Sequence, residues 1–199
     1  MKINLDDIMF WMDAIRDSKD QYRTLESFWK GQLRSKRWLV ESLQEVISLE
    51  NKTIAIHGGW NGVLATLLFN AEPKIKHITS IDIDPECEKI AYTMNKNYEI
   101  EGRFTAITAD MTTYRSETDI IINTSCENIT QEQYDAWLAL QPDSLFVVQS
   151  NNYFELEEHI RCVKEGNEFM EQCNLNPLRQ CSMELSKYTR FMIIGNKNV

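Results

Sequence analysis

The chain is short of cations, and it lacks long apolar runs. Its 199 residues carry 21 Lys and Arg against 30 Asp and Glu, for a net charge of −9. Binding of nucleic acid without sequence preference depends on neutralising phosphates, so this balance argues against such a partner. No apolar run approaches the roughly 18 residues that a membrane span needs. The acidic N-terminus, MKINLDDIMFWMDAIRD, is unlike a secretory signal, and we expect a cytoplasmic protein.

Residues that bind metals are also scarce. The sequence has only three histidines, and none of its five cysteines has the CxxC spacing typical of zinc sites. We therefore expect no metal site. The cysteines are interpreted as reduced, and most of them as packing residues.

The length and the composition predict one globular protein of the α/β class. Residues 1–50 are interpreted as an N-terminal helical extension packed on the domain, because their apolar residues recur at helical spacing. From residue 51 to 199, short apolar strands alternate with helices. We expect strands at 53–57, 77–82, 103–108, 118–123 and 144–150, helices at 85–97, 131–140 and 155–172, and two final strands around a turn at Ser186–Lys187.

Two stretches of this pattern carry the functional signal. Residues 53–62, TIAIHGGWNG, read as a buried strand that enters a glycine-rich turn, after which a helix begins. Such a junction leaves amide groups pointing outward, where a nucleotide-like ligand can approach without meeting side chains. The strand at 77–82 is apolar until it ends in Asp82. An acid at the end of the second strand of a doubly wound sheet is placed to hold the hydroxyls of a ribose.

Together these stretches resemble the first two motifs of the class I S-adenosylmethionine (SAM)-dependent methyltransferases, with HGGWNG in place of the usual glycine loop. The resemblance covers roughly Asn51 to the C-terminus. It implies a Rossmann-like, doubly wound, mostly parallel seven-stranded sheet that ends in an antiparallel hairpin, and it implies SAM as the cofactor. In the family, an acid after the third strand lies beside the adenine amino group and an apolar neighbour lies under the ring. The expected cofactor-binding residues are His57, Gly58, Gly59, Trp60, Gly62, Asp82, Ile83, Asp110, Met111 and Asn123.

The polar segments after the fourth and fifth strands are the expected place for reacting groups. Glu127 can take a proton from an attacking amine or hydroxyl, although a helix-start carboxylate remains the alternative. Cys126 would need a lowered pKa to act as a nucleophile, and packing is the alternative. Asn151 is a candidate substrate-binding residue. The segment NTSCEN lacks the prolines and the aromatic residue of the amino-group nucleic-acid methylases, so methylation of a base is not favoured.

A second candidate contact with the substrate lies in the N-terminal part. Ser35 is a plausible N-cap for a helix SKRWLVESLQEVI. Lys36 and Arg37 would then lie in the first turn, where the helix dipole disfavours cations. Cations in such a place can be there to bind an anion, such as the carboxylate of SAM or of a substrate. A solvated helix face is the alternative.

These features favour a SAM-dependent methyltransferase, or another SAM-using transferase, that acts on a small or modest-sized polar acceptor. Transfer of the aminocarboxypropyl group belongs to the same class. The sulfonium of SAM is already activated, so such an enzyme mainly aligns its reactants and needs no metal or triad. One alternative is a non-catalytic member of the fold that serves as a subunit in a homo- or hetero-oligomer. An NAD-dependent oxidoreductase is another, but the final hairpin and the pair Asp110–Met111 speak against it.

Overall fold

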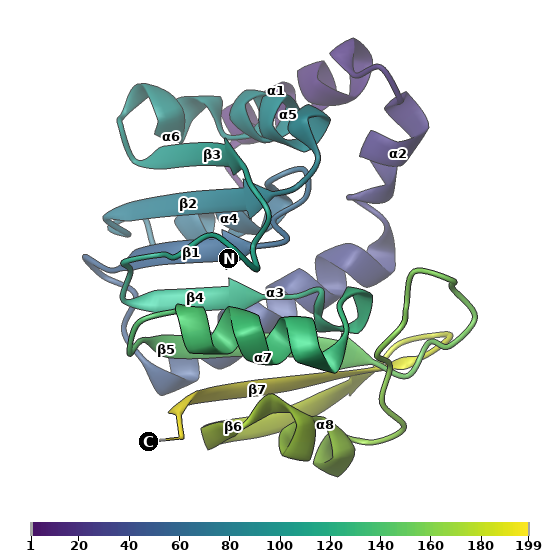
Figure 1. Ribbon diagram of the computed structural model, residues 1–199. Helices are drawn as coiled ribbons and strands as arrows, with labels where there is room; N and C mark the ends of the chain where they lie inside the picture. Colours follow the sequence, from purple (N-terminus) through teal and green to yellow (C-terminus); the bar gives the residue numbers. More distant parts are fainter. Residues whose placement is uncertain (1, 199) are drawn as a thin grey trace.

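The structure is a computed structural model that describes residues 2–198. Its centre is a seven-stranded sheet in the order β3-β2-β1-β4-β5-β7-β6 (Figure 1). Strands β1 to β5 run parallel, whereas β7 runs antiparallel to both β5 and β6. The predicted fold class is thus confirmed. The strands are β1 (Thr53–His57), β2 (His77–Asp82), β3 (Phe104–Thr108), β4 (Ile120–Asn123), β5 (Leu145–Asn151), β6 (Leu175–Glu184) and β7 (Thr189–Lys197).

The strand order reverses beside β1. This strand pairs with β2 on one side and with β4 on the other, so the connections that leave the ends of β1 and β4 diverge. In open sheets of this kind, ligands bind outside the carboxyl ends of the strands at such a reversal. The topology therefore places the site at the ends of β1 and β4.

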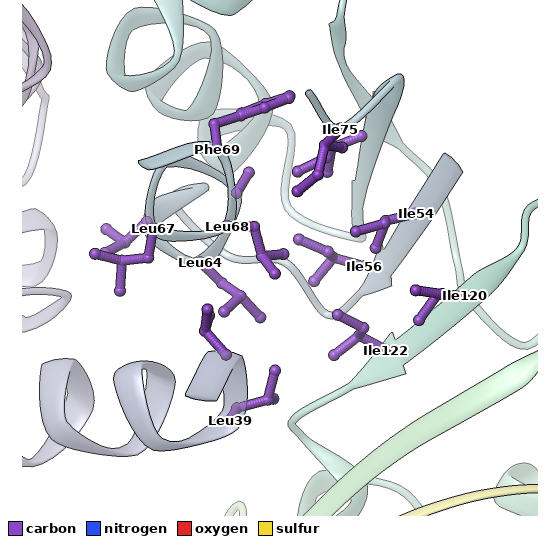
Figure 2. Packing of buried hydrophobic residues seen from close by; sticks show 14 of the residues in the cluster. Leu39, Ile54, Ile56, Leu64, Leu67, Leu68, Phe69, Ile75, Ile120 and Ile122 are labelled. Atoms are coloured by element: carbon purple, nitrogen blue, oxygen red, sulfur yellow. The ribbon is translucent and has the colours of Figure 1, made fainter. Parts of the chain in front are cut away.

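Helices cover both faces of the sheet (Figure 1). Alternate strand residues point to opposite faces, so Ile54 and Ile56 belong to one core and Ala55 to the other. Figure 2 shows the first core, in which Leu39 and Leu64 pack toward the strands. The helices are α1 (Leu5–Asp17), α2 (Gln21–Glu26), α3 (Lys30–Val46), α4 (Val63–Ala71), α5 (Pro85–Met94), α6 (Lys96–Ile100), α7 (Gln131–Leu140) and α8 (Gly166–Cys173).

The N-terminal helices share the first core with the sheet. Trp11 of α1 and Leu39 of α3 are buried in it. Asn61 of the glycine turn donates a hydrogen bond to Ser27, which follows α2, over 2.6 Å. Arg23 of α2 pairs with Asp84, after β2, at 2.6 Å. These contacts hold the segment between α1 and α3 against the loops that end β1 and β2.

Two local predictions are wrong. Of the expected helix 155–172, only the part from Gly166 onward is helical, in α8 (Gly166–Cys173). The preceding backbone bonds to distant segments instead: Arg161 N–H donates to the Glu127 carbonyl in the loop after β4, and Val163 N–H donates to the carbonyl of Asn151 at the end of β5. Ser35 is not an N-cap, since α3 already begins at Lys30. Within residues 2–198, no helix combines the length and the apolar character needed to cross a membrane.

Candidate functional site

The turn after β1 requires glycine at three positions. Gly58 and Gly62 have φ angles of 66° and 80°, in the left-handed region that side chains disfavour. At Gly59, an added Cβ would lie 2.0 Å from the Oγ atom of Ser80 in β2. Helix α4 follows Gly62 and has no side-chain N-cap. The turn therefore exposes glycine backbone at a helix N-terminus, beside the side chains of Trp60 and Asn61, and a helix N-terminus suits a polar or charged ligand.

Asp82 connects this turn to the end of β2. Its Oδ2 atom accepts a hydrogen bond from the Trp60 amide at 2.8 Å, and its Oδ1 atom accepts one from the Asp84 amide at 3.1 Å. Each carboxylate oxygen keeps a further lone pair for a ligand hydroxyl. The next residue, Ile83, is 69 % exposed.

The ends of β3 and β4 approach the same edge. Asp110 is exposed, and its Oδ1 atom accepts a hydrogen bond from the Thr112 amide at 2.8 Å. The amide group of Asn123 lies 3.5 Å from the Met111 sulfur. An added Cβ at Gly58 would lie 3.2 Å from the Ser125 Oγ atom, so the glycine turn and the loop after β4 are neighbours. Asp110, Met111 and Asn123 thus lie where sequence reasoning expected them, at the ends of β3 and β4.

The His57 side chain points to the face of the sheet that α7 covers, opposite to the face that carries Ile54 and Ile56. It is fully buried, and its Nδ1 atom accepts a hydrogen bond from the indole N–H of Trp137 in α7 at 3.1 Å. The Nε2 atom therefore carries the proton and donates to Ser116 Oγ at 2.8 Å. Burial lowers the pKa of this imidazole to about 4. Both ring nitrogens are used, so only the backbone of His57 borders the glycine turn, and the expected contact of its ring with SAM is not supported.

A buried charged cluster follows β4. Glu127, which is 3 % exposed, accepts a hydrogen bond from the Asn151 amide at 2.7 Å through Oε1. The same oxygen lies 3.3 Å from Nη2 of Arg190 at the start of β7. The guanidinium also donates from Nε to Gln149 at 3.2 Å. Among the described residues, the Oε2 atom of Glu127 has no hydrogen-bond partner. The structure thus brings Glu127 and Asn151, which were expected to have separate roles, into contact with each other and with an arginine that sequence reasoning missed.

Cys126 does not have the properties of a nucleophile. Its side chain is fully buried, in the core that α7 covers. Burial raises the pKa of the thiol to about 12. A nucleophilic cysteine needs a lowered pKa, so Cys126 is a packing residue.

Lys36 and Arg37 differ in position. Lys36 is half-buried, donates a hydrogen bond to Gln32 at 2.7 Å, and lies 5.9 Å from the centre of the Trp60 ring. Its pKa falls to about 7, mainly through burial and also through the charge of Arg190. The Arg37 side chain is 66 % exposed and pairs with Glu41 at 2.7 Å. Only Lys36 therefore belongs to the site, and the prediction for Arg37 finds no support.

This arrangement can be compared with known proteins. The structure superposes on magnesium protoporphyrin IX methyltransferase (ChlM) from Synechocystis PCC 6803 with bound SAM, with a TM-score of 0.65 and 13 % identity, over 98 % of this chain and 93 % of that chain. The fold is that of the SAM-dependent methyltransferases. The pyocyanin biosynthetic protein PhzM matches with a TM-score of 0.65 and 15 % identity, over 94 % of this chain and 62 % of that one. The structure of aTrm5 in complex with tRNALeu matches with a TM-score of 0.57 and 15 % identity, over 81 % of this chain and 45 % of that one.

No protein-family model and no curated protein matches the chain by sequence. Identities of this size show the methyltransferase fold alone, and the chain spans about 62 % of PhzM. The names of ChlM and aTrm5 point to very different binding partners, a porphyrin and a tRNA. The fold therefore does not determine the acceptor, which must be argued from the residues of this chain.

Proposed function

We propose that the protein is a SAM-dependent methyltransferase, or a related SAM-using transferase, that acts on a small or modest-sized polar acceptor. The observation that carries this proposal is the link between Asp82 and the Trp60 amide, at 2.8 Å. It fixes a carboxylate at the end of β2 beside the glycine turn that follows β1, and the strand order reverses at β1. That is the arrangement needed to hold a ribose next to a polar tail.

In this proposal, the cofactor lies along the ends of the first four strands. The carboxylate of Asp82 accepts hydrogen bonds from the ribose hydroxyls, and the exposed side chain of Ile83 packs on the nucleoside. Asp110 and Met111 lie beside the adenine. The backbone of Gly58, Gly59, Trp60 and Gly62 approaches the methionine part, and Asn123 borders it from the end of β4. Solved structures of the ChlM fold with bound SAM and with bound SAH support this choice of cofactor.

The acceptor is proposed to lie over the loop after β4. In methyl transfer, the nucleophile forms a bond to the methyl carbon while the carbon–sulfur bond breaks, and the sulfur keeps the electron pair. A nucleophile that starts protonated must also lose a proton. We assign this step to the Oε2 atom of Glu127, which is buried and has no hydrogen-bond partner among the described residues. Asn151 and Arg190 hold the other oxygen and so orient the carboxylate.

A small acceptor is favoured over nucleic acid by the net charge of −9. We also expect a cytoplasmic location, and an oligomer remains a hypothesis. The oxidoreductase and the non-catalytic subunit receive no support from the comparisons.

The test is calorimetric titration of the purified protein with SAM, S-adenosylhomocysteine (SAH) and NAD. We expect micromolar binding of the first two and none of NAD, followed by turnover in a screen of polar acceptors. The absence of binding by both sulfur nucleotides would refute the proposal. Binding of SAH without turnover on any acceptor would instead favour the non-catalytic subunit.

A further inference from the structure

An open groove lies between α7 and α8, on the face of the sheet opposite to α3. Both helices lie on this face (Figure 1) and contribute to the same core. The groove has a volume of about 760 Å³, which is in the range of small-molecule sites. Its lining includes Leu138 and Ala139 of α7, Gln172 of α8, and Arg161 from the segment before α8. None of the residues assigned above to the cofactor or the acceptor lines it.

Arg161 is 7 % exposed and has no paired carboxylate. Its guanidinium donates from Nε to the Cys126 carbonyl at 3.1 Å and from Nη1 to Gln131 Oε1 at 2.8 Å, and it lies 4.4 Å from the centre of the Tyr134 ring. Among residues 2–198, its Nη2 atom has no hydrogen-bond partner, and none of the ion pairs within 4.0 Å includes this arginine. Burying a cation without a counterion costs free energy, so an anion that pairs with the two N–H groups of Nη2 gains that energy on binding.

The side chain of Gln172 is the second group of the groove with an unused polar atom. Its Oε1 atom is buried and has no hydrogen-bond partner within the described part of the chain. The Gln131 amide connects the two places, because its oxygen accepts from Arg161 and its nitrogen donates to the Gln172 carbonyl at 2.9 Å. The Gln172 side chain can therefore turn aside without breaking a bond to Oε1, which opens the covered Nη2 atom of Arg161 to the groove. Rotation of the same amide would present its NH₂ group to an anion there.

We propose that this groove binds a small carboxylate ligand, which pairs with the Nη2 atom of Arg161. The two oxygens of a carboxylate match the planar guanidinium. A doubly charged phosphate fits less well, because Asp135 and Glu171 also line the groove and repel the second negative charge. The site does not depend on the proposed function, but it lies behind the proposed base, since the Arg161 amide donates to the Glu127 carbonyl at 2.9 Å.

The test follows the NMR signals of the Gln131 and Gln172 side-chain amides and of the Arg161 Nε–H group while sodium acetate replaces sodium chloride at constant ionic strength. The titration is made on the free and on the SAH-saturated protein, and it is repeated with sodium phosphate. Arg161→Gln removes the cation, and Gln172→Glu places a carboxylate in the groove. Arg37→Gln is the matched control, because it removes an exposed arginine. Thermal unfolding of each variant shows that it is folded.

We expect acetate to shift these signals with one saturable dissociation constant, equally with and without SAH, and phosphate to bind more weakly. Arg161→Gln should weaken acetate binding about tenfold or more. Gln172→Glu should abolish the response, because its own carboxylate pairs with Arg161, and Arg37→Gln should behave as the wild type does.

The proposal is overturned if the signals do not respond, if SAH displaces acetate, if phosphate binds more tightly than acetate, or if either groove variant binds acetate as the wild type does. Should Arg161→Gln fail to fold, Gln172→Glu decides alone. A protein that binds acetate in this way but binds neither SAM nor SAH keeps the groove site, and that result removes the proposed function instead.

Discussion

Replacing Lys36 by methionine should stabilise the protein, although the change removes a charged side chain from the site. Methionine keeps the aliphatic stem and removes the ammonium that Arg190 repels and that burial disfavours. A pKa that falls from 10.5 to about 7 on folding corresponds to a penalty of about 4–5 kcal/mol at neutral pH if none of it is screened. Lys36 is only half-buried, so solvent screening reduces this penalty. The variant also loses the hydrogen bond from Lys36 to Gln32, which offsets about 1 kcal/mol of its gain in stability. We expect a net gain of about 1–3 kcal/mol.

The pH dependence follows from the direction of the shift. Between pH 7 and 10.5 the unfolded chain keeps the proton on Lys36 while the folded protein loses it, so the unfolded state binds more protons. The stability of the wild type therefore rises with pH in this window relative to that of the variant. The advantage of Lys36→Met should be largest below pH 7 and should shrink toward pH 10.

The assay is urea unfolding of both proteins at pH 6, 7.5 and 9, followed by tryptophan fluorescence. Arg37→Met is the matched control, because its side chain is exposed, and its effect should stay within about 0.5 kcal/mol at each pH. A variant that is less stable than the wild type at pH 6, or an advantage that does not decrease at pH 9, would refute the reasoning.

Three further predictions concern the other residues of the site. Asp82→Ala should weaken SAM binding more than tenfold in calorimetry, because the ribose hydroxyls lose a charged acceptor; unchanged affinity would show that the pocket lies elsewhere. Glu127→Gln should lower turnover at least tenfold while SAM affinity stays within about threefold, and a comparable loss of SAM binding would make Glu127 a cofactor ligand. It should also destabilise the fold by up to about 3–5 kcal/mol, because Arg190 loses its buried counterion. Gly59→Ala should destabilise the protein by about 1–3 kcal/mol, because the new methyl group would meet the Ser80 hydroxyl at 2.0 Å. The cost should fall by at least half when Gly59→Ala is measured in a Ser80→Ala background, and equal costs in both backgrounds would exclude this contact as the cause.

The elements with a strong local pattern were predictable from sequence. β1, β4 and β5 are short apolar runs, and their observed bounds differ from the expected ones by no more than two residues. The final hairpin was also predicted, with its turn between Glu184 and Thr189. In each case residues near one another in the chain decide whether a strand or a turn forms, because apolar periodicity and turn residues act over a few positions. Helix 131–140 was found for the same reason, and its capping box at Thr130 explains its sharp start.

The segment 155–165 was mistaken for a helix because its competing partners are distant in sequence. The amides of Arg161 and Val163 bond to the carbonyls of Glu127 and Asn151 instead of continuing a helical turn. The start of α3 was misplaced for a related reason. Ser35 has the side chain of an N-cap, but its hydroxyl is buried against Gln149 of β5, inside a helix that began earlier.

By itself, the sequence determined the individual strands, the glycine turn and the acid at the end of β2, because each depends on residues that are close together in the chain. Only the tertiary structure decided which side chains share the site. The alternation of strand residues turned the His57 ring toward Trp137 and away from the turn. The antiparallel insertion of β7 beside β5 placed Arg190 opposite Asn151 and hence against Glu127. The place of Lys36 beside the Trp60 ring arises in the same way, since α3 and the turn after β1 meet only when the chain is folded.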